Sequence, residues 1–367
     1  MQTGKGSQNL EQEVLKAGLC TSCGACVDLC PYIKVVNDRV AIIEPCGLDE
    51  GKCYDFCPRT PTKIGALRRS VFGSTRAYSP IGPYISIEMA QAKDPKVRRR
   101  AQYGGVVSAL ITYAIESEEI DTAVLTKPFN GNLMPKSIVA EKSSQVLQCA
   151  GTNYVPAATL GELNRLLKKR KEHIGIVGLP CQILALRKMQ ISEHEIGAEM
   201  VKLAIGLFCT WALSYKGFYE LLSKNVDPSS IKHIDIPPPP ANIMMVDTDS
   251  SQVKIPLQEV RKFIKPTCSI CFDMTSEFAD ISIGVVEGEE EWNTLIVRTT
   301  EGEKLVQKAK RSKVIETKPL KKANFDHLKE ASQLKKKRAI EEIVKRTGDE
   351  KNLMYLCLSA AERKMFL

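Results

Sequence analysis

The stretch HIGIVGLPCQILALRKMQ, residues 173–190, joins a short apolar block to a helical pattern. The apolar residues 174–177 predict a strand, and Arg187 and Lys188 follow Cys181 by about two helical turns. A strand that leads into a helix is the repeating unit of α/β proteins. This stretch therefore favours an α/β fold for the part of the chain that surrounds it.

The same hydrophobic pattern continues on both sides of this stretch, from about residue 79 onward. Apolar blocks of about 5–8 residues alternate with helical patterns of about 10–15 residues, as in βα units. Strands are predicted at residues 122–126, 201–207 and 281–285, and helices at 105–117, 160–171 and 213–224. We therefore predict an α/β core domain over residues 76–320, a mixed sheet with flanking helices.

Two other segments interrupt or follow this pattern. The tetraproline at residues 237–240 can neither continue a helix nor sit in a central strand, so it predicts an extended connector. Residues 321–367 are Lys-rich with helical spacing and predict a basic, solvated tail of one or two helices. The basic stretches at 168–171 and 335–338 are likewise expected on solvated faces, with attraction for an anionic ligand or an acidic redox partner as the alternative.

The N-terminal part of the chain is dominated by cysteine. Seven of the 13 cysteines lie between Cys20 and Cys57. The first run has the spacing C-x2-C-x2-C-x3-C-P that bacterial ferredoxins use for iron–sulfur clusters, and a second run reads C-x6-C-x3-C-P. Residues 1–75 therefore predict a small bacterial-ferredoxin-like α+β iron–sulfur domain. A zinc knuckle is the alternative, although zinc sites do not need this order of cysteines.

The ferredoxin pattern also predicts which thiols share a cluster, because the last cysteine of each run reaches the other cluster. The first cluster takes Cys20, Cys23, Cys26 and Cys57, and the second takes Cys30, Cys46 and Cys53. The second set is one thiol short. Asp49 stands where a further cysteine is expected, so either Asp49 is an oxygen ligand or the cluster is a [3Fe–4S] cluster.

Four further cysteines come from separate parts of the predicted core. Cys181 and Cys209 each follow a predicted strand, and Cys268 and Cys271 form a C-x2-C loop. Four soft ligands from separate elements suit a third cluster inside the core, although buried structural thiols would give the same pattern. Cys149 and Cys357 have no matching partners.

Composition and charge narrow the class of protein. Hydrophobic residues make up 43% and charged residues 26%, as in ordinary globular proteins. The formal net charge of +9 favours anionic partners. Residues 1–14 lack the apolar segment of a secretory signal, and no apolar run reaches the ~18–20 residues of a membrane span. We therefore expect a cytoplasmic protein, in which 13 cysteines favour metal ligation over disulfides.

Several common function classes find no support in the sequence. It contains no G-x-G-x-x-G fingerprint, so a Rossmann site for a nicotinamide cofactor is unsupported. Aromatic residues make up 6% and no nucleic-acid-binding module is present, so nucleic acid is not an expected partner. The four histidines are scattered, and we assign them no catalytic role.

Two short segments of the core have the residues of a cofactor site. Gly104 and Gly105 come directly before a helical pattern, where backbone N–H groups can approach a phosphate or a planar ring. Thr152 and Asn153 offer polar donors next to the aromatic face of Tyr154. Plain turns and loop caps use the same residues, so neither segment is decisive alone.

From Gln102 to about Pro319 the sequence resembles the coenzyme F420 hydrogenase/dehydrogenase beta subunit family. The resemblance is carried by six blocks in order: YGGVVSALITYAIE, AGTNY, VGLPCQILALRKMQ, GLFC, CSICFD with EFADISIG, and EEWNTLIVRT. It implies an α/β core that holds FAD and one [4Fe–4S] cluster, and a site where the deazaflavin F420 stacks on the flavin.

The resemblance also implies roles for particular residues. The cluster of the core would be bound by Cys181, Cys209, Cys268 and Cys271. The cofactor would be contacted by residues of the first three blocks, namely Gly104, Gly105, Ser108, Gly151, Thr152, Asn153, Tyr154 and Pro180. Arg187 and Lys188 lie near enough to Cys181 in the sequence to meet an anionic cofactor, with an exposed helix face as the alternative.

The fused N-terminal module is similar to the layout of the input subunit of the membrane-bound F420H2 dehydrogenase, whereas the hydrogenase subunit lacks such a module. The second cysteine run departs from that pattern, since it has C-x6-C in place of two C-x2-C steps. The expected function is hydride exchange between F420 and FAD, with single electrons passing through two or three [4Fe–4S] clusters.

Partners and direction are left open at this point. The electrons could pass to subunits of a membrane F420H2 dehydrogenase, a heterodisulfide reductase or a hydrogenase, or to ferredoxin, with the membrane reached only through a partner. Peripheral attachment to the cytoplasmic side of a membrane complex is therefore compatible with the sequence. One alternative is a ferredoxin-dependent flavin reductase of another substrate, and a second is a non-catalytic electron relay.

Overall fold

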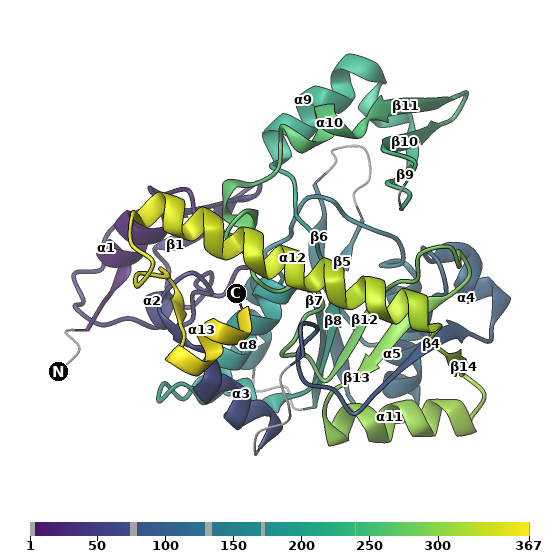
Figure 1. Ribbon diagram of the computed structural model, residues 1–367, viewed down its shortest axis with the longest axis horizontal. Helices are drawn as coiled ribbons and strands as arrows, with labels where there is room; N and C mark the ends of the chain where they lie inside the picture. The colour runs from purple at the N-terminus through teal and green to yellow at the C-terminus, as the bar shows by residue number, and fades with distance from the viewer. Residues whose placement is uncertain (1–3, 74–78, 129–133, 170–172, 239, 367) are drawn as a thin grey trace.

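A computed structural model describes residues 4–73, 79–128, 134–169, 173–238 and 240–366, and its largest element is an eight-stranded sheet (Figure 1). The strand order is β14 (Ile315–Pro319), β4 (Ser86–Ala92), β13 (Asn293–Val297), β12 (Ile281–Val285), β8 (Val201–Leu207), β7 (Ile174–Gly178), β5 (Thr122–Lys127) and β6 (Lys136–Ala140). The four strands β12, β8, β7 and β5 are parallel, and every other neighbouring pair is antiparallel. The predicted mixed sheet of an α/β core is confirmed.

Helices cover both faces of this sheet. One face packs against α5 (Val106–Glu116), α6 (Ser143–Leu147) and α11 (Thr300–Arg311), and α4 (Pro95–Arg100) lies beside β4. The other face packs against α7 (Thr159–Lys168) and α8 (Pro180–Ile191), which the 3-10 helix η2 (Ala198–Met200) follows. Within β5, Ala123 and Leu125 face the helices α5, α6 and α11, and Val124 faces α7 and α8. This alternation is expected for strands that are buried on both faces.

The predicted elements agree closely with the observed ones. Strands β8 and β12 have the predicted bounds, and β5 and β7 extend one residue further. Helix α9 (Tyr215–Asn225) begins two residues later than predicted because Leu213 is held in an extended bridge to Ile264. The predicted end of the helix 160–171 lies outside the described residues.

A smaller antiparallel sheet stands apart from the main one, at the top of Figure 1. It contains β9 (Ile231–Asp235), β10 (Ile243–Thr248) and β11 (Gln252–Pro256), packed with α9, α10 (Leu257–Arg261) and the 3-10 helix η3 (Pro228–Ser230) around a separate apolar cluster. The tetraproline connects β9 to β10. Pro237 and Pro238 have no regular secondary structure, as predicted for an extended connector, and position 239 lies outside the described residues.

The N-terminal segment forms short elements around its cysteines. These are α1 (Ser7–Leu10), the π-helix η1 (Glu11–Leu15), the hairpin of β1 (Ile33–Val36) and β2 (Arg39–Ile42), α2 (Lys52–Asp55), β3 (Thr62–Lys63) and α3 (Ile64–Phe72). Asn164 of α7 donates hydrogen bonds to the carbonyl oxygens of Ala25 and Val27, at 3.1 and 2.7 Å. The segment therefore shares an apolar core with the face of the sheet that α7 and α8 cover.

The C-terminal segment is less solvated than predicted. It contains α12 (Lys322–Thr347), β15 (Leu356–Cys357) and α13 (Ala360–Phe366), and β15 pairs with β3 of the N-terminal segment. Helix α12 runs across the front of the molecule from the sheet to the N-terminal segment (Figure 1). Lys335 and Lys336 are buried, so the expectation of a solvated face at 335–338 is wrong for these two residues. Within the described ranges, no helix is long and apolar enough to cross a membrane.

Candidate functional site

A large cavity of about 770 Å³ lies at the carboxyl ends of the parallel strands. Its lining includes the last residues of three strands, Gly178 of β7, Leu207 of β8 and Val285 of β12, and the penultimate residue of β5, Thr126. Ligands of open α/β sheets bind at this edge, where the loops that follow the strands diverge. The volume is in the range of roughly 300–1,000 Å³ that is typical of cofactor and small-molecule sites.

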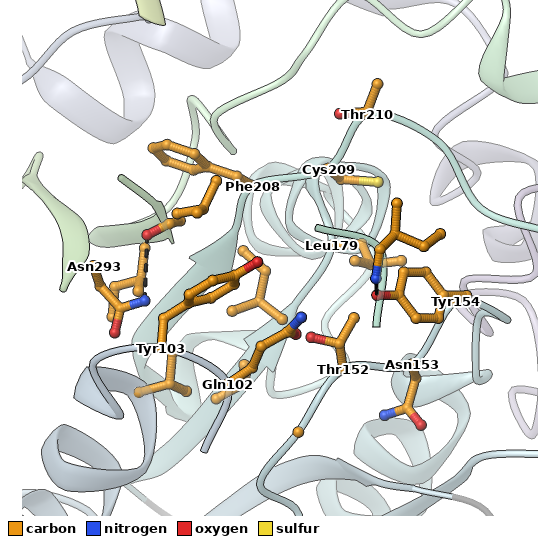
Figure 2. Close-up of a pocket in the computed structure, with 18 of the residues that line it drawn as sticks. Gln102, Tyr103, Thr152, Asn153, Tyr154, Leu179, Phe208, Cys209, Thr210 and Asn293 are labelled. Carbon is orange, nitrogen blue, oxygen red and sulfur yellow. Dashed lines mark hydrogen bonds between the residues drawn. The ribbon is translucent and has the colours of Figure 1, made fainter. Parts of the chain in front are cut away.

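The start of helix α5 forms one wall of this cavity. Gly105 is in the left-handed region, with φ of 70°, and Gly104 is so close to Ala90 and Asn293 that a Cβ atom would lie 2.8 Å from each. Only glycine fits these two positions without strain. Tyr103, next to this turn, points into the cavity in Figure 2. The side-chain oxygen of Asn293 accepts a hydrogen bond from the backbone N–H of Val106 at 3.3 Å.

The loop at residues 150–154 forms the opposite wall. Thr152 and Gln102 face each other across the cavity in Figure 2, and the Tyr154 hydroxyl accepts a hydrogen bond from the backbone N–H of Ile236 at 2.8 Å. Burial raises the pKa of Tyr154, which keeps this phenol neutral. The side-chain oxygen of Asn153 is buried with no hydrogen-bond partner among the described residues. A buried acceptor without a donor is suited to a ligand that supplies one.

Most of the predicted cofactor contacts line the large cavity, but not all of them. The lining includes Gly105, Ser108, Gly151, Thr152, Asn153 and Tyr154. Gly104 does not line this cavity and packs closely against Ala90 and Asn293. Pro180 lines a second, smaller cavity. These six residues fit the flavin that the resemblance implies, because they combine neutral polar groups with an apolar floor.

The structure corrects the roles of Arg187 and Lys188. Helix α8 carries both residues away from the strand ends, and neither lines the cavity. Arg187 is buried and pairs with Asp280 at 2.9 Å, and Lys188 donates to the backbone oxygens of Cys57 and Thr60 at 2.7 and 3.3 Å. Burial lowers the pKa of Lys188 to about 8. Both cations therefore tie elements together rather than reaching the cavity.

The small cavity brings together the four cysteines of the predicted core cluster, Cys181, Cys209, Cys268 and Cys271, here called the third thiol set. Cys209 and Lys335 line both cavities, so this thiol set begins directly behind the wall of the large cavity. Arg59, Lys265 and Lys335 also line the small cavity. Three cations around four thiols match the negative charge of an iron–sulfur cluster with four thiolate ligands.

One thiol of the third set differs from the other three in the direction of its pKa shift. Burial raises the pKa of Cys181, Cys209 and Cys268. Burial also opposes ionisation of Cys271, but the cations of Lys335 and Arg59 outweigh it and lower its pKa. The Lys335 amine donates to the backbone oxygen of Cys209 at 2.6 Å, and Arg59 donates to the Thr267 hydroxyl at 2.8 Å. The cations are thus fixed beside the thiols.

The two N-terminal thiol sets stay predictions from the cysteine spacing, and burial affects thiols of both. In the first thiol set (Cys20, Cys23, Cys26 and Cys57), burial and then the charge of Cys57 raise the pKa of Cys23 to about 12. In the second thiol set (Cys30, Cys46 and Cys53), burial and then the charges of Cys30 and Cys46 raise the pKa of Cys53 to about 11. The charge of Cys23 also raises the pKa of Cys181. The first set therefore lies near the third.

For the fourth position of the second thiol set, Asp49 stays a prediction, and the structure places Ser7 beside Cys46. Asp49 is exposed, whereas the buried hydroxyl of Ser7 lies 3.3 Å from the Cys46 sulfur and accepts from the Cys46 backbone N–H at 3.4 Å. This hydrogen bond lowers the pKa of Cys46. No pattern in the sequence pointed to Ser7, because the contact joins residues 39 positions apart.

Across the described part of the chain, no three His, Cys, Asp or Glu side chains converge on the position of a single metal ion. In a cubane cluster each iron atom takes one protein ligand, so the thiols surround the cluster instead of meeting at one point. Zinc instead gathers its four ligands around one atom, and thiol ligands suit either kind of site.

Comparison with known proteins agrees with this architecture. Residues 88–164 match the N-terminal part, and residues 171–323 the C-terminal part, of the coenzyme F420 hydrogenase/dehydrogenase beta subunit. A coenzyme F420 hydrogenase subunit beta of Methanococcus voltae is 31% identical over 276 residues, which are 73% of this chain and 96% of that protein. A chain in the structure of the F420-reducing [NiFe] hydrogenase complex from Methanosarcina barkeri superposes with a TM-score of 0.69 at 26% identity, over 75% of this chain and 96% of that one.

A third relative extends across the N-terminal segment as well. The coenzyme F420-dependent sulfite reductase of Methanocaldococcus jannaschii is 28% identical over 351 residues, which cover 91% of this chain. This chain spans 52% of that longer protein. The fold, the order of the matched parts and the level of identity agree, and the chain belongs to the coenzyme F420 hydrogenase/dehydrogenase beta subunit family.

Proposed function

We propose that this chain exchanges hydride with coenzyme F420 at an FAD bound in the large cavity and passes single electrons through iron–sulfur clusters to a partner. The observation that carries this proposal is the position of Cys209, which lines both the large cavity and the small cavity of the third thiol set. Cys209 is one of six residues that line both cavities, and it is the one among them that carries a thiol, so the place for an organic cofactor adjoins the place for a cluster.

The residues of the cavity support the binding of a flavin. Bound FAD would supply two-electron chemistry toward the deazaflavin and one-electron chemistry toward the clusters. The glycine turn before α5 and the buried oxygen of Asn153 would hold and orient the flavin, and Thr152 and Gln102 offer further polar contacts. Cys181, Cys209, Cys268 and Cys271 would bind a [4Fe–4S] cluster behind Cys209.

The order of the thiol sets supports a path for electrons between the cavity and the second set. The third set adjoins the first through Cys181 and Cys23, and Cys26 and Cys53 connect the first to the second. Lys188 and Arg59 lie along this path, where Lys188 contacts the backbone of Cys57. The second set includes Cys30 and Cys46, which are only partly buried. We therefore propose the second set as the place where a partner protein or ferredoxin exchanges electrons.

The class of partner follows from the same arrangement. The partner must accept or donate one electron at a time, as ferredoxin and the cluster-bearing subunits of hydrogenase, heterodisulfide reductase or F420H2 dehydrogenase complexes do. The similarity to a longer sulfite reductase supports a further option, in which the electrons reach a reductase module.

The test is anaerobic reconstitution with FAD, iron and sulfide, followed by mixing with reduced F420. We expect roughly 11–12 iron atoms per chain, from two four-iron clusters and one three- or four-iron cluster, and bleaching of both flavin and cluster absorbance. If the flavin stays oxidised with reduced F420 but bleaches with reduced ferredoxin, the site reduces another substrate and the proposal is wrong. Clusters without bound flavin would indicate a non-catalytic relay.

A further inference from the structure

Helix α12 contributes one of its faces to the large cavity. Ala331, Leu334, Lys335 and Arg338 all line it, at the i, i+3, i+4 and i+7 spacing of one helical face. Leu334 is 50% exposed although it is large and apolar. Only the first two residues of α12 fall within the matched family ranges, which end at residue 323. The helix therefore adds to the cavity a surface that the matched parts of the family do not describe.

Charged side chains are few in this cavity, and two arginines stand out among them. The charged lining residues are Arg261, Glu287, Lys335 and Arg338. Glu287 is paired with His327 at 3.0 Å, and Lys335 is buried against Cys209. Within the described ranges, Arg261 forms no side-chain ion pair, and the Arg338 side chain donates only to the backbone oxygen of Leu334, at 3.3 Å. Two exposed guanidinium groups therefore remain available to a ligand.

The two arginines come from different parts of the fold. Arg261 is the last residue of α10, which belongs to the small sheet unit, and Leu257 one turn earlier lines the same cavity. Arg338 lies on α12. Figure 1 shows α10 near the top of the view, above α12. The remaining lining of the cavity is apolar or neutral and polar, with side chains such as Gln102, Thr152 and Asn153.

We propose that Arg261 and Arg338 form an anion-binding site at the mouth of the large cavity, which holds the phosphate- and carboxylate-bearing tail of the deazaflavin. Guanidinium groups bind phosphates and carboxylates through paired hydrogen bonds, and they remain charged at every physiological pH. The neutral interior then takes the ring system and the exposed cations take the tail. This inference rests on the proposed function, since it assigns the tail of the same substrate.

The experiment measures equilibrium binding of oxidised F420 to the FAD-loaded, cluster-reconstituted chain by deazaflavin fluorescence. Arg261→Gln and Arg338→Gln are compared with Lys337→Gln, an exposed neighbour on α12 that does not line the cavity. We expect each arginine variant to bind F420 roughly tenfold more weakly. The same variants should bind the deazaflavin chromophore without its phosphate and glutamates as the unaltered chain does. Added salt should weaken F420 binding to the unaltered chain more than to the variants.

Each of the remaining outcomes would contradict either the proposed function or the anion site. If the unaltered chain retains FAD but binds no F420, the proposed function fails, and the assignment of the tail fails with it. If the unaltered chain binds F420 and the arginine variants bind it equally well, only the anion site is wrong. If the variants lose FAD, or lose the tail-free chromophore to the same degree, the arginines serve the flavin or the ring instead, which also overturns the inference.

Discussion

The third and second thiol sets place similar ligands in opposite surroundings. The third set combines four cysteines from separate elements of the core, and Arg59, Lys265 and Lys335 line the same small cavity. The second set combines the buried Cys53 of α2 with the partly buried Cys30 and Cys46, and the Ser7 hydroxyl lies 3.3 Å from the Cys46 sulfur. This difference supports our proposal that the third set exchanges electrons with the cofactor site, whereas the second set exchanges them with a partner.

The largest effect is expected from removing a ligand of the third thiol set. We predict that Cys271→Ala loses roughly four of the 11–12 iron atoms and leaves the N-terminal clusters intact, because its thiol is shared only within that set. Iron analysis and electron paramagnetic resonance of the reduced protein measure this. Cys357→Ala is the matched control, since Cys357 is exposed and outside all three sets. Equal iron content in the two variants would contradict the assignment.

A second prediction concerns the anchor that holds α12 against the third thiol set. Lys336 and Glu277 form an ion pair with both side chains fully buried, and Arg68 reaches Glu277 at 2.9 Å. Removing one partner of a buried pair costs about 3–5 kcal/mol, so Lys336→Met should lower the free energy of unfolding by about that amount.

Chemical denaturation of the apoprotein gives the measurement, with Lys337→Met as the exposed neighbour for control. An unchanged midpoint in Lys336→Met would show that α12 does not depend on this pair.

A third prediction tests the cations around the interior set. Arg59 lines the small cavity and contacts the ring of Tyr355 at 4.6 Å. Removing its charge disfavours the more negative, reduced cluster. We expect Arg59→Gln to lower the reduction potential of the third cluster by roughly 65–130 mV, which corresponds to one charge-assisted hydrogen bond. Redox titration followed by electron paramagnetic resonance resolves this shift, and a higher potential would contradict the electrostatic account.

The smallest effect is expected at the outer set. Loss of the Ser7 hydroxyl removes one neutral hydrogen bond to the Cys46 sulfur. Ser7→Ala should lower the potential of the second cluster by roughly 20–65 mV and leave the third cluster unchanged. Asp49→Ala is the informative comparison. A larger effect of Asp49→Ala on iron content or potential would restore Asp49 as the ligand of the second cluster.

Much of the fold could be predicted because its signals are local. Apolar blocks at residues 201–207 and 281–285 gave strand bounds that the structure confirms. Gly105 and the loop at 150–154 were identified as cavity residues from short motifs. Each of these predictions depends on residues that are close in the chain.

The predictions that failed depend on contacts across the fold. Arg187 and Lys188 seemed close to Cys181 by sequence, but α8 leads them away from the strand ends, toward Asp280 and Cys57. Lys335 and Lys336 looked like a solvated basic face, yet thiols and Glu277 compensate their burial. Asn293 lay inside a quoted motif without an assigned role. Long-range pairing of this kind leaves no periodic pattern in a sequence.

The central claim is that electrons leave the large cavity through the third thiol set, and Cys209 tests it most directly. Rapid mixing of reduced F420 with reconstituted Cys209→Ala should still bleach the flavin, while the N-terminal clusters remain oxidised. Cys149→Ala, which changes a cavity thiol outside the three sets, should reduce both as the unaltered chain does. Reduction of the N-terminal clusters at the unaltered rate in Cys209→Ala would contradict the account.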